Sequence, residues 1–502
     1  MSSLWLSYKN LFDNINIKNK LDDNLETDIC IIGAGIFGIT CGYYLSKLGF
    51  KVTILEKDFI SSKTTGHTTA KITSQHGLFY DYLANSYSSA FAKDYLDVNE
   101  MAIKNIKNII DNENINCDFE YQNSFVYTTK TEEIDIIKKE YNTLIDLGYK
   151  PELVTKTGLP FPIKIALCFK NQAQFNPVKY LAFLSKSILD NGGEIYENTT
   201  AKDLKSDFDN LITFTNNNYI KSKYVIIATH YPFINFPGFY FTKMYQSSSY
   251  IIGVDTKKAL FNGMYISAKE PVFSFRTAKF NDKDILLIGG GDHRTGKPSS
   301  YNDTYGKLEA TAKKYYPDCE VLFRWNTRDC ISLDKLPYIG TFSPNMPNVF
   351  VGTGFKKWGM TLSNVASNIV VDKIIGKHNK YEYLFKSSRL KPIKNYDEFK
   401  NMIVESSNSL LFNKLKRPNM DFSEIKNDSG SIIEINGEKV GIYKDKNGKI
   451  FAVKPICTHL GCLLSWNDID KTWDCPCHGS RFNFDGKNLY DPAFKDLSRY
   501  NF

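Results

Sequence analysis

Two cysteines and two histidines near the C-terminus are spaced for metal binding. In the stretch PICTHLGCLLSWNDIDKTWDCPCHGSRF, Cys457 and His459 form C-x-H, Cys475 and His478 form C-x-x-H, and 15 residues separate His459 from Cys475. Each of two loops therefore offers one thiolate and one imidazole. Four such ligands suit a structural zinc ion. They also suit a 2Fe-2S cluster in which two cysteines hold one iron and two histidines hold the other.

The residues that must position these loops are typical of a small antiparallel β domain. Residues 429–453, SGSIIEINGEKVGIYKDKNGKIFAV, alternate short apolar segments with Asn-Gly turns. Asn-Gly between two such segments is the strongest short-range signal for a hairpin. We therefore expect an all-β unit around the cysteine and histidine loops.

A second group of residues suited to chemistry lies near the N-terminus, where TDICIIGAGIFGITCGYYLSKLGFKVTILEKD predicts a βαβ unit. An apolar run is followed by Gly33, Gly35 and Gly38, then by a helical pattern and a second strand that ends before Glu56. The glycines permit a tight turn, close approach of the backbone to a pyrophosphate, and close packing of the helix on the strand. Glu56 can accept hydrogen bonds from ribose hydroxyls. The unit predicts dinucleotide binding without deciding between FAD and NAD.

Composition limits the class of protein. A chain of 502 residues with 42% hydrophobic content can form about three domains of roughly 150 residues each. The net charge of +8 is spread along the chain without a basic stripe, which argues against nucleic acid as a partner. No run of about 18 apolar residues predicts a membrane span, and the N-terminus lacks a secretion signal. Six isolated cysteines also fit a reducing compartment, so we expect a soluble, cytoplasmic protein.

Motifs downstream of the βαβ unit resemble the D-amino-acid oxidase-like (DAO) superfamily of flavoenzymes over roughly residues 26–378. They occur in the family's order: SSKTTGHTTAK, QAQFNPVKYLAFL, KYVIIATHYP and LPYIGTFSPNMPNVFVGTGFKKWGMTLS. The resemblance implies FAD as the cofactor, with Ala201 at the adenine and Thr229 below the pyrophosphate. His230 stands where the family often has glycine, which makes the local turn an open question. The FAD-contacting positions expected in all are Gly33, Gly35, Gly38, Glu56, Lys57, Thr64, Thr65, His67, Ala201, Thr229, Gly354, Gly359, Met360 and Thr361.

Two of these positions carry a more specific expectation. A helix that starts near Met360 would place its N-terminus beside the flavin pyrimidine ring and stabilise negative charge on the reduced flavin. His67 aligns with a position at which some relatives attach flavin covalently through histidine. The alternative is a loop histidine that hydrogen-bonds near the flavin.

The boxes CTHLGC and CPCHGS closely resemble the Rieske 2Fe-2S signature and favour that cluster over zinc. The resemblance implies Cys457, His459, Cys475 and His478 as ligands. It also implies a disulfide between Cys462 and Cys477, a pair for which zinc has no use. Residues 491–494, DPAF, resemble the proline loop that covers such clusters. The histidines are expected at the exposed tip of the domain, where they can dock near the flavin edge.

The expected fold is therefore α/β, with a Rossmann-like FAD domain and a mixed-sheet α+β substrate domain, followed by a small all-β Rieske domain. We expect the oxidoreductase at residues 26–380, a linker at 381–424 and the Rieske domain at 425–502. Within the first unit, the FAD part is expected at 26–80, 165–232 and 326–380. The substrate part is expected at 81–164 and 233–325.

Together these modules resemble a bacterial fusion of a DAO-like flavoprotein with a Rieske domain. The predicted function is an FAD-dependent dehydrogenase that oxidises a small amine or amino acid at a CH-NH group. It would pass electrons through the cluster to an unidentified external acceptor. Two alternatives stay open: an oxidase that reduces oxygen directly, with a structural or sensing Rieske domain, and a non-catalytic redox sensor. The sequence indicates neither the catalytic residues nor the substrate.

Overall fold

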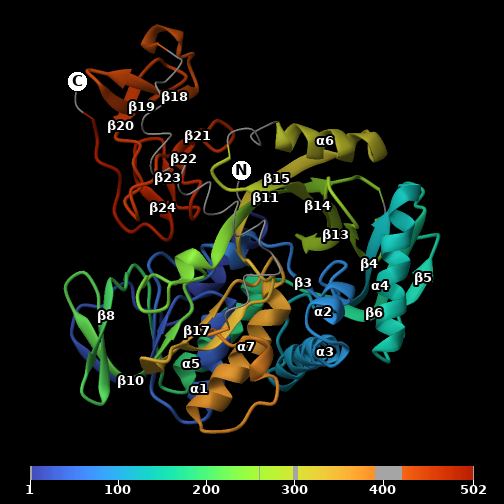
Figure 1. The fold of residues 1–502 in the computed structure, drawn as a ribbon, viewed down its shortest axis with the longest axis horizontal. Coiled ribbons are helices and arrows are strands. Elements are labelled where there is room, and N and C mark those ends of the chain that lie inside the picture. Colours follow the sequence, from blue (N-terminus) through green and yellow to red (C-terminus); the bar gives the residue numbers. More distant parts are fainter. Residues whose placement is uncertain (1–2, 259, 298–302, 390–420, 501–502) are drawn as a thin grey trace.

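The computed structural model describes residues 3–258, 260–297, 303–389 and 421–500 (Figure 1). These residues form two large sheets with helices and a separate C-terminal β unit, so the predicted combination of an α/β flavoprotein fold with an all-β tail is confirmed. Most of the predicted linker, 381–424, lies outside the described residues. Among the described residues, no helix combines the length and the apolar character needed to cross a bilayer.

The first sheet has eight strands and a parallel centre. Its main path runs β16-β17-β10-β1-β2-β7, and β8 and β9 extend from β10 as an antiparallel ribbon. The apolar residues of β1 are buried between β10 and β2, as expected for a central parallel strand. The strands are β1 (Leu25–Ile32), β2 (Val52–Leu55), β7 (Glu194–Tyr196), β8 (Asp203–Asp207), β9 (Asn210–Phe214), β10 (Tyr219–Ile227), β16 (Tyr338–Ser343) and β17 (Met346–Thr353).

Three helices pack with this sheet: α1 (Ile36–Lys47), α5 (Pro177–Asp190) and α7 (Gly359–Ile374). The sequence Asn-Pro starts α5 in the usual way, because the Asn176 side chain accepts from the first backbone N–H groups and Pro177 needs no donor there. Glycine is required at the start of α1, since a Cβ on Gly38 would lie 2.0 Å from the carbonyl oxygen of Gly33.

The second sheet has nine strands and follows the order β15-β11-β14-β13-β12-β4-β6-β3, with β5 paired to β6. It contains β3 (Lys71–Ile72), β4 (Glu120–Thr128), β5 (Glu152–Val154), β6 (Ile165–Gln174), β11 (Met244–Asp255), β12 (Met264–Ser267), β13 (Phe273–Phe280), β14 (Lys283–Arg294) and β15 (Glu320–Ser332). The accompanying helices are α2 (Tyr80–Ser86), α3 (Ser89–Asn112), α4 (Ile134–Asp146) and α6 (Thr304–Tyr315). Strands from both predicted parts of the oxidoreductase unit therefore pair in this sheet.

The C-terminal unit consists of a three-stranded and a four-stranded antiparallel sheet. The hairpin between β18 (Ser429–Ile435) and β19 (Glu438–Lys444) turns at Asn436 and Gly437, whose φ values are 51° and 81°. These positive values explain the Asn-Gly pair. The other strands are β20 (Ile450–Val453), β21 (Ser465–Asn467), β22 (Thr472–Asp474), β23 (Arg481–Asn483) and β24 (Asn488–Tyr490).

Candidate active site and iron-sulfur centre

A large cavity opens where the first sheet meets the loops after its strands. Its walls come from the β1–α1 turn, the end of β2, the segments 61–68 and 199–201, the end of β10, and the start of α7. Ten of the predicted FAD-contacting residues line it: Gly33, Gly35, Glu56, Lys57, Thr64, Thr65, Ala201, Thr229, Gly359 and Met360. Residues scattered along the sequence are thus brought to one cavity by the parallel sheet.

Four predicted positions do not line this cavity: Gly38, His67, Gly354 and Thr361. Gly38 permits the close approach of α1 to the turn at Gly33. The Thr361 hydroxyl donates to the carbonyl of Thr73 at 3.0 Å and accepts from its N–H at 2.9 Å, so it fixes the segment after β3. The Nδ1 atom of His67 donates to the carbonyl of Lys63 at 2.7 Å. Covalent attachment of flavin through His67 stays a prediction.

The β1–α1 turn is shaped for close approach by a ligand. Gly33 has φ of 108°, and a Cβ there would lie 2.6 Å from the carbonyl oxygen of Ala228. Glu56 is buried, and its two carboxylate oxygens accept from the N–H groups of Ala34 at 2.9 Å and Asp58 at 3.0 Å. Burial raises the pKa of Glu56 despite these two donors. The buried carboxylate retains lone pairs for ribose hydroxyls.

Five polar side chains that line the cavity have buried atoms without a hydrogen-bond partner: the hydroxyls of Ser61, Ser62, Tyr231 and Ser363 and the Nε2 atom of His230. Since buried polar groups are almost always paired in native proteins, these atoms fit a bound polar cofactor. His230 has φ of 66°, in the left-handed region that glycine adopts most readily, so a histidine makes the turn that the resemblance left open. Burial lowers the pKa of His230 to about 4, so the imidazole is neutral at pH 7.

A second, smaller cavity adjoins the first. Thr64, Thr68, Asp329 and Lys357 line both cavities, and the second extends between β11, β13 and β14 of the nine-stranded sheet. Asp329 lies on β15, and burial raises its pKa to about 6. A small molecule bound in the second cavity would therefore lie against a molecule bound in the first cavity.

Lys71 is the most unusual residue of the second cavity. It is 7% exposed, and its Nζ donates to the carbonyl of Tyr265 at 2.8 Å and the hydroxyl of Ser274 at 2.7 Å. Within the described residues no carboxylate lies within ion-pair distance of it. Burial, reinforced by the nearby Arg276, lowers the pKa of Lys71 to about 7. The sequence did not point to Lys71, because its only signal there is a charged residue in a two-residue strand whose residues are both buried.

The cysteine and histidine loops have the same local geometry. In the first loop, the Cys457 N–H donates to the carbonyl of Cys462 at 2.8 Å, and the Gly461 N–H donates back to Cys457. In the second, the Cys475 N–H donates to Ser480 at 2.8 Å, with a matching bond from Gly479 back to Cys475. Each loop is therefore a tight turn closed by the backbone of its ligand cysteine.

The four predicted ligands meet in two like pairs. The thiols of Cys457 and Cys475 are in hydrogen-bonding contact, and the rings of His459 and His478 lie 5.0 Å apart. The Nε2 atom of His459 donates to Oδ1 of Asn235 at 2.9 Å, so its Nδ1 carries the lone pair. The Nδ1 atoms of both histidines are buried without a partner. Two thiols and two free imidazole nitrogens are the donor set that a Rieske cluster needs.

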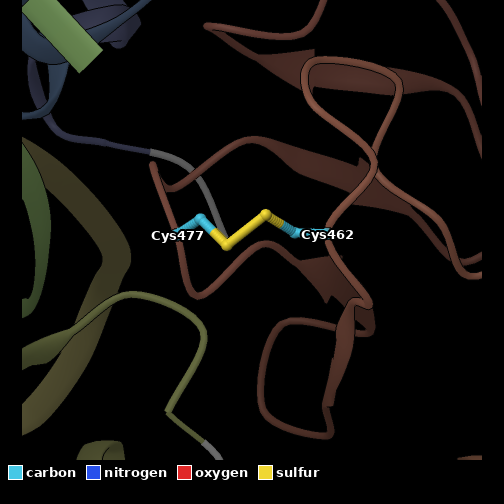
Figure 2. Close-up of a disulfide and its surroundings, with 2 residues drawn as sticks. All are labelled: Cys462 and Cys477. Carbon is cyan, nitrogen blue, oxygen red and sulfur yellow. A yellow bond between two sulfur atoms is a disulfide. The ribbon is translucent and has the colours of Figure 1, made fainter. Parts of the chain in front are cut away.

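The structure contains the disulfide between Cys462 and Cys477 that the resemblance implied (Figure 2). It ties the first cysteine loop to the second. The sulfur of Cys475 lies within 4.8 Å of both disulfide sulfurs. Because those two sulfurs are bonded to each other, they do not provide thiolates for a metal.

The histidine side of the Rieske domain is packed against the oxidoreductase unit. Besides the bond to Asn235, His478 makes a hydrogen bond with the backbone of Phe241, whose ring lies 6.0 Å from that of His478. His478, which was expected at the docking tip of the domain, is therefore covered in the folded chain and is 6% exposed. The segment of the oxidoreductase unit between β10 and β11 covers it.

Comparison with known proteins places these two sites in their families. Residues 28–373 match the family model "FAD dependent oxidoreductase" (DAO), and residues 418–501 match the model "Rieske [2Fe-2S] domain". The chain belongs to the DAO family of FAD-dependent oxidoreductases and carries a C-terminal Rieske domain. It binds FAD and a 2Fe-2S cluster, and the buried unpartnered polar atoms of the two sites fit these groups.

One relative shares both modules along its length. The chain is 36% identical over 479 residues to the Rieske 2Fe-2S iron-sulfur protein YhfW of Bacillus subtilis (strain 168). The match covers 95% of this chain and 94% of the relative. Among solved structures, glycine oxidase from Geobacillus kaustophilus matches 73% of this chain and 100% of its own, with a TM-score of 0.62 and 19% identity. L-proline dehydrogenase from P. horikoshii matches 73% of this chain and 98% of its own, with the same TM-score and identity. Both likenesses concern the fold.

Proposed function

We propose that the chain is a dehydrogenase that oxidises an amine-bearing carboxylic acid and passes the electrons through its own Rieske domain to an external acceptor. The observation that carries the proposal is the packing of the predicted cluster ligands against the flavoprotein, through the 2.9 Å contact of His459 with Asn235. When bound, FAD supplies two-electron chemistry and the 2Fe-2S cluster supplies one-electron transfer. Cys457, His459, Cys475 and His478 are the proposed ligands.

The second cavity is the proposed substrate site, because it shares four lining residues with the FAD cavity. Lys71 has no anionic partner among the described residues, so a substrate carboxylate would provide one. Asp329 lines both cavities and can hold the amine and accept its proton, since a carboxyl with a pKa of about 6 is mostly ionised at neutral pH. Lys357 and Asp292, paired at 2.6 Å, border the same cavity.

Glycine oxidase and L-proline dehydrogenase, whose folds this chain shares, are named for amino-acid substrates, and this supports the proposed substrate class. The proposed compartment is the cytoplasm. Six cysteines outside the Rieske boxes are unpaired in the structure, as expected under reducing conditions.

Rapid mixing under anaerobic conditions tests the proposal. The protein is mixed with a panel of amines, amino acids and N-methyl amino acids, and flavin and cluster absorption are followed together. Flavin should bleach first and the cluster second, at a rate independent of protein concentration, with a rhombic electron paramagnetic resonance signal. A cluster that stays oxidised while flavin turns over, with hydrogen peroxide formed, would favour the oxidase. Failure of the whole panel to bleach flavin would favour a redox sensor.

A further inference from the structure

One loop of the Rieske domain forms part of the FAD cavity. Tyr490, Asp491 and Phe494 line that cavity together with Glu56 and Lys57 of the oxidoreductase unit. These three residues belong to the segment 490–495, called the bridging loop below, which begins at the last residue of β24. The sequence marks it as a cover for the cluster, and nothing in the sequence relates it to the flavoprotein.

Charged side chains of the oxidoreductase unit hold the first half of the bridging loop. The guanidinium of Arg328 lies 3.9 Å from the ring centroid of Tyr490, and the Lys63 ammonium lies 4.9 Å from it. Asp491 forms an ion pair with Lys57 at 2.9 Å. Two cations against one ring, with an ion pair beside them, fix the loop at the mouth of the cavity.

The second half of the loop is apolar on its cavity side. The ring of Phe494 meets the ring of Phe233 edge to face at 6.2 Å, and both line the cavity. Gln246, another lining residue, donates from Nε2 to the carbonyl of Asp491 at 3.1 Å. An aromatic pair and a hydrogen bond to the backbone therefore join the Rieske domain to the oxidoreductase unit at this wall of the cavity.

The opposite side of the bridging loop is bonded to both cysteine and histidine loops. The Ala493 N–H donates to the hydroxyl of Ser480 at 3.0 Å, in the second loop. The Thr458 hydroxyl donates to the carbonyl of Lys495 at 2.7 Å, in the first loop. Six residues thus contact the FAD cavity on one side and the proposed cluster loops on the other.

We propose that the bridging loop is a part of the FAD-binding site contributed by the Rieske domain, so that the docked domain retains FAD. The loop closes the end of the cavity bounded by Glu56 and Lys57, and its aromatic side chains offer apolar contact to the cofactor there. This inference rests on FAD occupying the first cavity. It does not depend on the substrate or on the direction of electron flow.

The test is FAD affinity in the full-length protein. FAD is removed, the protein is titrated with FAD, and the dissociation constant is read from flavin fluorescence. Because truncated aromatic contacts in a buried site commonly weaken binding strongly, Tyr490→Ala and Phe494→Ala should each raise Kd roughly tenfold or more. Phe494→Leu keeps most of the apolar volume and should give a smaller rise. The cluster spectrum of each variant reports whether its Rieske domain is folded.

Two controls separate contact from general effects. Phe451→Ala removes an aromatic ring of the Rieske domain that contacts Tyr443 and Phe484 outside the cavity, and should leave Kd unchanged. Asn326→Asp removes the N–H that donates to Asp470 across the domain interface at 2.8 Å, keeps the oxygen that accepts from Arg328, and should also leave Kd within twofold of the parent. A Kd unchanged in both Tyr490→Ala and Phe494→Ala overturns the inference. So does an equal rise in Asn326→Asp, which would mean that docking alone retains FAD. Flavin reduction at saturating FAD is measured separately, so either result leaves the proposed function standing.

Discussion

The iron-sulfur site is made by two short loops with the same backbone geometry, whereas the FAD cavity gathers residues from segments between Ile32 and Phe494. In the first site, each cysteine and histidine pair lies on one tight turn, and the disulfide joins the two loops. In the second, the parallel sheet brings distant turns together at the ends of its strands. One substitution can therefore abolish the function of the local site, whereas one substitution in the dispersed site should weaken its function only in part.

The two sites also differ in how they meet solvent. The FAD cavity is closed in part by the Rieske domain, and the histidine side of the Rieske domain is covered by the flavoprotein segment that carries Asn235 and Phe241. Each site therefore forms part of the surroundings of the other. This mutual cover favours internal transfer of electrons over exchange between separate molecules.

The largest expected effect comes from the local site. His459→Ala removes one of four proposed ligands, and we expect the 2Fe-2S signal and transfer to the acceptor to be abolished. Flavin reduction by substrate should persist, because the dispersed site keeps its lining residues. Anaerobic flavin bleaching measures reduction of the flavin by substrate, and electron paramagnetic resonance measures the 2Fe-2S signal.

His378→Ala is the matched control, since this histidine is exposed and lies outside both sites. It should keep both signals. Loss of flavin reduction in His459→Ala would contradict the separation of the two sites.

The same contrast explains what the sequence could predict. The chemistry of the two boxes could be predicted from the sequence, because each ligand pair lies within four residues on one tight turn. The Gly33 turn and Glu56 could be predicted because both belong to one βαβ unit, in which the glycines and the acid have a characteristic spacing. Lys71 and Asp329 could not, since their meeting depends on pairing in a nine-stranded sheet that brings β3 and β15 to one cavity. The contribution of Tyr490 to the FAD cavity depends on domain docking, which has no local signal.

The next largest effect should come from Lys71 in the substrate cavity. Lys71→Met keeps the length of the side chain and removes the cation. A hydrogen bond to a charged group contributes about 1.5–3 kcal/mol, so kcat/KM for a carboxylate substrate should fall roughly ten- to a hundredfold. Lys170→Met, on a lysine that is exposed and outside the cavity, should change nothing. Equal kinetics for Lys71→Met and the parent would remove Lys71 from the substrate site.

The pH dependence of substrate affinity gives a second measure of Lys71. Its pKa of about 7 means that the ammonium is present below pH 7 and is lost as the pH rises. The affinity of the parent for an anionic substrate should therefore fall as the pH rises above about 7. A bound anion raises the pKa of Lys71, so the pH at which this falling limb begins moves upward when substrate is bound. Lys71→Met should lack the limb. Arg276 stays charged across this range, because its pKa is lowered only to about 9.

An effect of similar size on the rate, with its pH limb on the acid side, is expected from Asp329. Its pKa of about 6 means that the carboxyl is protonated below pH 6 and ionised above it. If it accepts the proton of the substrate amine, kcat/KM should fall below about pH 6 in the parent. Asp329→Asn should be slower at pH 8 by roughly 10²-fold, the usual contribution of a general base, and its profile should be flat near pH 6. An acid limb that survives in Asp329→Asn assigns proton transfer to another group.

The smallest effect concerns the tuning of the cluster rather than its presence. Phe482 lies on β23, is fully buried beside the second loop and offers no hydrogen-bond donor. The resemblance to the Rieske signature implies a tyrosine at this position in respiratory-chain members, where its hydroxyl would donate to a ligand sulfur. A donor stabilises the reduced, more negative cluster, so Phe482→Tyr should raise the midpoint potential. One net hydrogen bond of about 1 kcal/mol corresponds to roughly 40 mV for a one-electron couple.

Protein-film voltammetry of the full-length chain measures this shift, and the flavin potential in the same protein is the internal reference. Because Phe482 does not line the FAD cavity, the flavin midpoint should not move. Phe484→Tyr is the matched control: this aromatic residue packs on Tyr443 and Phe451, away from the cluster loops, and should leave both potentials unchanged. A cluster potential that stays constant or falls in Phe482→Tyr would mean that the new hydroxyl does not reach a ligand sulfur. A joint shift of both potentials would show that the two sites are coupled electrostatically through the bridging loop and its charged neighbours.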